Sequence, residues 1–102
     1  MSAAAKEPEI VSLLEALERR STGWDLADHW SGDRYAVGVA SKSEPGRLAY
    51  ISTWGQPAAS YYVQFETPSE SGDVYQVLRE VSVPSVDAAA DLVAAHMESR
   101  AR

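Results

Sequence analysis

Residues 34–67 read RYAVGVASKSEPGRLAYISTWGQPAASYYVQFET, and their pattern indicates the fold class. Within it, apolar residues alternate with small or polar ones, and this period of two is typical of half-buried strands. The alternating runs lie at 34–42, 47–54 and 60–67. Glu44-Pro45-Gly46 and Gly55-Gln56-Pro57 separate them with residues that favour turns. Because such short connections join antiparallel neighbours, the stretch predicts a meander.

Two further segments extend the predicted sheet to four or five strands. The run at 73–83 alternates over a length that favours a bulge near Arg79. The segment 24–30, WDLADHW, fits a short edge strand, and a helical turn is nearly as compatible with it. The sheet is therefore best defined in its middle and least defined at its N-terminal edge.

A helix is predicted at each end of the sheet. Residues 8–20 begin with a proline, which suits a first helical turn, and 85–98 begin with Ser85, a good N-cap. Helical spacing then produces an apolar stripe on each segment: Ile10, Leu13, Leu14 and Leu17 on the first, and Val86, Ala89, Ala90, Val93 and Met97 on the second. We predict a single α+β domain over 8–98, with an antiparallel meander flanked by an N-terminal and a C-terminal helix. Disordered tails are expected at 1–7 and 99–102.

The composition is that of one small acidic domain. The 102 residues include 15 Asp and Glu against 9 Lys and Arg, a net charge of −6 with neutral histidines. This charge repels nucleic acids and anionic membrane surfaces. Cysteine is absent, and the N-terminus has neither the basic nor the apolar region of a secretory signal. We expect a cytoplasmic protein that binds neither nucleic acid nor membrane and needs no cofactor or metal.

The two faces of the predicted sheet differ in character. The core face is expected to carry Tyr35, Val37, Val39, Ile51, Tyr61, Val63, Phe65, Val77 and Val81. The other face is expected to carry Leu48, Tyr50, Trp54, Tyr62 and Gln64 beside the small residues Ala36, Gly38 and Ala40. An exposed face is normally polar, so an aromatic one suggests recognition. We take Tyr50, Trp54, Tyr62 and Gln64 as candidate partner-binding residues.

A structural alternative applies to the same residues. If the helices cover one face each, or if a strand is shifted by one residue, the aromatic side chains belong to the core. The leading function is a non-catalytic protein-interaction module, acting as a homodimer or on a basic partner. The alternative is a small-molecule binder with an apolar pocket between sheet and helix.

Catalytic and metal chemistry find little support. Asp25, Asp28 and His29 offer oxygen and imidazole ligands, but a metal site needs three or four that converge. His96 lies near the end of the second helix, where a partly protonated imidazole suits the helix dipole. No serine lies in a nucleophile turn, so no catalytic residue is assigned. A small hydrolase or isomerase using His29 with Asp25 or Asp28 is the third hypothesis, and we do not expect an enzyme.

Overall fold

The computed structural model describes residues 6–27, 34–44, 46–57, 60–68 and 75–98. Both predicted helices form, as α1 (Pro8–Arg20) and α2 (Val86–Glu98). Pro8 begins α1, and the Ser85 hydroxyl accepts a hydrogen bond from the Ala88 N–H at 3.1 Å, which confirms it as the N-cap of α2. Among the described residues, neither helix has the length and apolar character needed to span a membrane.

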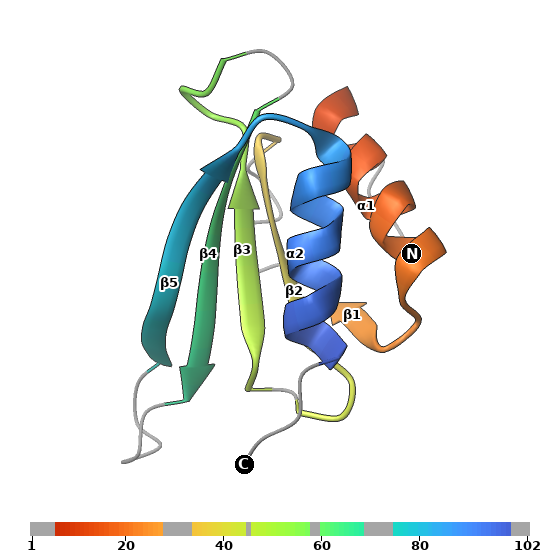
Figure 1. The fold of residues 1–102 in the computed structure, drawn as a ribbon, viewed down its shortest axis with the longest axis vertical. Coiled ribbons are helices and arrows are strands. Elements are labelled where there is room, and N and C mark those ends of the chain that lie inside the picture. Colours follow the sequence, from red (N-terminus) through yellow and green to blue (C-terminus); the bar gives the residue numbers. More distant parts are fainter. Residues whose placement is uncertain (1–5, 28–33, 45, 58–59, 69–74, 99–102) are drawn as a thin grey trace.

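The strands form one antiparallel sheet in chain order, which confirms the meander and the α+β fold (Figure 1). They are β1 (Trp24–Leu26), β2 (Ala36–Ser41), β3 (Leu48–Ser52), β4 (Tyr61–Pro68) and β5 (Tyr75–Val83). The predicted bulge also forms. Phe65 pairs with Arg79 whereas Glu66 pairs with Val77, so one extra residue of β5 lies beside Arg79. The edge segment is a strand over Trp24–Leu26, and its predicted continuation from Asp28 to Trp30 lies outside the described residues.

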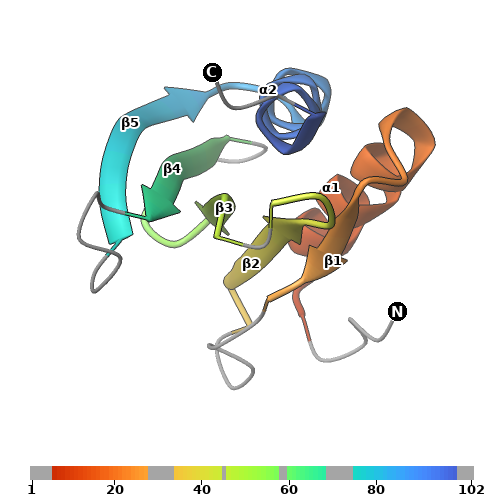
Figure 2. The ribbon, with the colours of Figure 1, turned by 90° about the horizontal axis from the view of Figure 1, so that it is seen from below.

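Both helices pack against the same face of the sheet, as Figure 2 shows from below. α2 lies over β2, β3 and β4, and α1 lies beside α2. Arg20 joins the helices, because its guanidinium donates to Asp87 at 3.0 Å and to Asp91 at 2.6 Å. The alternative in which each helix covers a different face is therefore wrong. The face turned away from the helices is hereafter the second face.

The core lies between the first face and the helices. From the sheet it includes Val37, Val39, Ile51, Tyr61, Val63 and Phe65, all predicted, with Val81 partly buried against them. The prediction that Tyr35 lies in the core is wrong. Tyr35 precedes β2 by one residue and is 39% exposed, and its ring packs against Trp54 at the end of the sheet. The side chain of Val77 lies outside the described residues.

Hydrogen bonds tie the start of α1 to the sheet. The Glu7 N–H, expected in the N-terminal tail, donates to the Arg34 carbonyl oxygen at 2.8 Å. The Thr53 hydroxyl donates to the Glu7 carboxylate at 2.9 Å, and the buried Tyr61 hydroxyl donates to the Glu9 carbonyl oxygen at 2.9 Å. These contacts fix α1 relative to the strands.

Candidate functional site

Three rows of side chains on the second face cross the strands. Strand pairing and alternation define the rows as Asp25–Ala40–Leu48–Glu66, Gly38–Tyr50–Gln64–Glu80 and Ala36–Ser52–Tyr62–Ser82. Tyr50, Tyr62 and Gln64, three of the predicted partner-binding residues, therefore lie in adjacent rows of one face. The described strand residues of this face include three carboxylates and no Lys or Arg.

Tyr50 and Tyr62 form the aromatic part of this face. Their ring centroids are 6.3 Å apart in an edge-to-face arrangement, which is a favourable geometry for aromatic pairs. Both side chains are half-buried, whereas Ala36 and Gly38 on β2 are buried. Gly38 pairs directly with Tyr50, so the two tyrosines lie next to the small residues of β2. The dent lined by Gly38, Leu48, Tyr50 and Glu66 among others holds about 10 Å³, the room of a single water.

A chain of hydrogen bonds crosses the same face. The Tyr62 hydroxyl donates to Glu80 and, at 2.9 Å, to the Gln64 side-chain oxygen. One hydroxyl proton serves both acceptors, and the closer Glu80 takes the larger share. The Gln64 amide donates to the Glu66 carboxylate at 2.9 Å. The bond to Glu80, with some burial, raises the pKa of Tyr62 to about 12, so the hydroxyl remains a donor at neutral pH.

Trp54 lies apart from these rows. The predicted strand 47–54 ends earlier, because β3 stops at Ser52 and Trp54 enters a turn. The Trp54 N–H donates to the Ser52 hydroxyl at 3.1 Å, and Gly55 provides the positive φ of 73°. The indole is 72% exposed and its centroid lies 5.2 Å from that of Tyr35. It is therefore an exposed aromatic residue at the end of the sheet.

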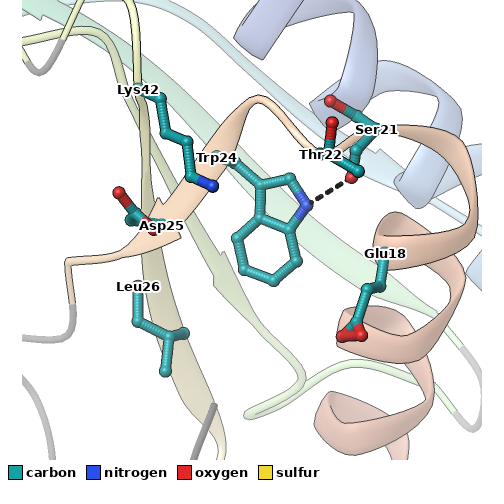
Figure 3. A pocket seen from close by; sticks show the side chains of 7 residues that line it. All are labelled: Glu18, Ser21, Thr22, Trp24, Asp25, Leu26 and Lys42. Atoms are coloured by element: carbon teal, nitrogen blue, oxygen red, sulfur yellow. Dashed lines mark hydrogen bonds between the residues drawn. The ribbon is translucent and has the colours of Figure 1, made fainter.

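Sequence reasoning missed a groove between the end of α1 and β1 (Figure 3). Its volume is about 660 Å³, and it is lined by Glu18, Ser21, Thr22, Trp24, Asp25, Leu26 and Lys42. Trp24 is 7% exposed, and its indole N–H donates to the Ser21 carbonyl oxygen at 3.0 Å. No local pattern marks this groove, because its lining comes from a helix end, an edge strand and the residue after β2.

The predicted chemical sites do not assemble in the described part of the chain. Asp28 and His29 lie outside it, and its His, Asp and Glu residues form no group of three suited to a metal. His96 differs from the expected helix cap. Its Nε2–H donates to the Leu48 carbonyl oxygen at 2.9 Å, and its ring packs on Phe65 with centroids 4.8 Å apart. Burial lowers the pKa of His96, so the neutral imidazole fastens α2 to β3.

Comparison of the chain with protein-family models, with curated proteins and with solved structures gives no match. The geometry and the charges of the two surfaces described above are therefore the basis for assigning a function.

Proposed function

We propose that this chain is a protein-interaction module that binds a basic partner through the second face. The observation that carries the proposal is the packing of both helices on the first face. This packing leaves to the second face an aromatic pair, Tyr50 and Tyr62, next to carboxylates. Tyrosines contribute much contact area for few rotatable bonds, which is why they are enriched at protein interfaces.

The charges of the second face favour a basic partner. Glu66 and Glu80 accept hydrogen bonds from Gln64 and Tyr62, which are neutral donors. Such bonds hold a carboxylate in place without cancelling its charge. The stem of an arriving Lys or Arg can lie along a tyrosine ring while its charged head reaches a carboxylate, which combines apolar packing with an ion pair. The net charge of −6 adds long-range attraction for a basic protein.

The same charges disfavour the homodimer hypothesis. A two-fold dimer through the second face places this surface against itself. Glu66 and Glu80 of each copy would then approach the carboxylates of the other, and like charges at an interface cost several kcal/mol. A heteromeric complex avoids that cost.

The shape of the second face favours a protein over a small molecule. Small-molecule sites have volumes of about 300–1,000 Å³ and enclose most of their ligand. The dent beside Gly38 holds about 10 Å³, and the space between the first face and the helices is filled by the buried core. Two half-buried tyrosines beside a dent of this size suit a macromolecular partner.

The experiment is a capture assay with a pair of matched charge reversals. Glu80→Lys reverses a charge on the second face, and Glu15→Lys makes the same change at an exposed position of α1. A stoichiometric basic protein should be retained by the wild type and by Glu15→Lys. It should be lost by Glu80→Lys and by Tyr62→Ala, and calorimetry with the purified partner should reproduce this order. Each variant is first shown by circular dichroism to be folded. Equal binding by Glu80→Lys and Glu15→Lys, or an acidic partner, would contradict the proposal.

A further inference from the structure

β1 forms one edge of the sheet, and its hydrogen bonds show which backbone groups point outward. The Lys42 N–H donates to the Gly23 carbonyl oxygen at 2.8 Å, and the Ala27 N–H donates to that of Gly38 at 2.9 Å. Bonded pairs alternate along an antiparallel ladder, so the pair of Asp25 with Ala40 is bonded as well. The N–H and C=O groups of Trp24 and Leu26 therefore point away from β2.

The groove lies along this outward edge. The last turn of α1 and the residues after it form one wall, with Glu18, Ser21 and Thr22, and β1 forms the other (Figure 3). Its volume of about 660 Å³ is within the range of small-molecule sites, but the unpaired backbone of β1 along it favours an extended chain as the occupant. A backbone edge and a lined hollow thus occur at the same place.

The charged groups that line the groove are available to a ligand. Within the described part of the chain, the side chains of Glu18, Asp25 and Lys42 make no ion pair, whereas Arg20 and Arg47 are each paired with carboxylates. The lining contains two carboxylates and one ammonium group. Its net negative charge is complementary to a cationic side chain.

We propose that the groove binds an extended peptide segment carrying Lys or Arg, which adds to β1 as a further strand. Backbone pairing with Trp24 and Leu26 supplies affinity, and side chains that alternate along the segment supply selectivity. Those pointing toward α1 meet the apolar surfaces of Trp24 and Leu26 and the carboxylate of Glu18, and those pointing the other way meet Asp25. This groove is distinct from the second face, to which the proposed function is assigned, and the two surfaces share only Asp25.

The probe is a fluorescein-labelled heptapeptide, TKVKVKT, measured by fluorescence anisotropy. Two versions carry N-methyl groups on alternate residues, offset by one position, so that one version blocks the N–H groups facing β1 and the other blocks those facing solvent. The first version should bind roughly tenfold more weakly, because two hydrogen bonds are lost, and the second should bind like the parent. Equal binding of both versions would overturn strand addition.

The charge requirement is tested separately. The matched peptide TEVEVET should bind at least about tenfold more weakly than TKVKVKT, since an attraction is replaced by a repulsion. Glu18→Gln should weaken binding of TKVKVKT, and Glu15→Gln, one turn earlier on α1 and outside the groove lining, should not. Equal effects of the two variants would show non-specific attraction to an acidic protein and overturn the assignment.

The position of the peptide is read from amide resonances. Binding of TKVKVKT should shift the Trp24 and Leu26 amides and slow their exchange with solvent. Leu26→Pro removes an outward N–H that β2 does not use, a change that edge strands tolerate, and it should weaken binding in a protein that still folds. Shifts confined to β5, the opposite edge, would overturn the proposal. Because Glu80→Lys leaves this site intact, failure here and failure of the second-face proposal are distinguishable.

Discussion

Two tryptophans of this chain provide a test of which aromatic residues are structural and which are available to a partner. Trp24→Ala and Trp54→Ala are the same chemical change at two positions. Trp24 is 7% exposed and belongs to the core, with its indole N–H bonded to the Ser21 carbonyl oxygen. Trp54 is 72% exposed in a turn and packs against Tyr35.

The expected costs differ by several kcal/mol. Truncation of a buried Trp to Ala destabilises a protein by about 3–5 kcal/mol, through lost transfer energy and the cavity left behind. Trp54→Ala leaves no core cavity and loses mainly the ring contact with Tyr35, which is worth about 0.5–1.5 kcal/mol. A domain of this kind is stable by about 5–15 kcal/mol in total. Trp24→Ala therefore brings it near unfolding, and Trp54→Ala does not.

The assay is urea unfolding followed by far-ultraviolet circular dichroism, a signal that does not depend on the removed indole. With a slope of about 1–3 kcal/mol per molar urea, a difference of about 3 kcal/mol separates the two midpoints by about 1–3 M. If Trp24→Ala does not fold, Trp24→Phe provides the comparison with a smaller loss. Equal midpoints for Trp24→Ala and Trp54→Ala would refute the assignment of Trp54 to the surface.

Three further outcomes follow from the structure. Burial lowers the folded-state pKa of His96 below the unfolded value of about 6.5, so the protein loses stability as the pH falls below about 6.5. His96→Gln can still donate to the Leu48 carbonyl oxygen, and its urea midpoint should fall less than that of the wild type between pH 7 and 5. An equal fall in both proteins would contradict the role of His96. The pKa of Tyr62 is raised to about 12, so the folded state keeps a proton that the unfolded state releases near pH 10, and stability falls as the pH rises above 10. Glu80→Gln should make one phenol titrate at a lower pH, measured by absorbance at 295 nm. An unaltered titration would exclude the hydrogen bond to Glu80 as the cause of the raised pKa. Gly55 has a φ of 73°, and a Cβ added there would lie in open space, so Gly55→Ala should cost about 1 kcal/mol from backbone strain alone. This cost lowers Tm by about 4–8 °C. An unchanged Tm would show that the backbone of the turn relaxes to accommodate alanine.

The elements and the strand order could be predicted from the sequence because both depend on local information. Period-two runs separated by turn residues specify strands and their neighbours, and the apolar stripe after Pro8 specifies a helix. Even the bulge beside Arg79 follows from strand length. The predicted positions of Tyr35 and Trp54 were wrong, because the alternation of apolar residues continues beyond the ends of the paired strands. Tyr35 lies before β2 and Trp54 after β3, and their rings pack against each other.

The side of the sheet chosen by each helix could not be predicted. An apolar stripe shows that a helix needs a partner surface, and it does not say which face of a sheet provides it. Here the helices also serve as partners for each other: Arg20 of α1 bonds to Asp87 and Asp91, one turn apart on α2. The groove was equally inaccessible, since Glu18, Asp25 and Lys42 meet only through tertiary structure.

Charged side chains between the helices and on the second face have different hydrogen-bond partners. Between α1 and α2, Arg20 pairs with Asp87 and Asp91. On the second face, Glu66 and Glu80 are held by neutral donors, so their hydrogen bonds are satisfied while their charges remain. Carboxylates already oriented in this way lose little freedom when a cation arrives, and preorganisation of this kind lowers the entropic cost of binding. The arrangement that stabilises the fold on one face thus leaves the other face negative and ordered, which are the properties that recognition of a basic partner requires.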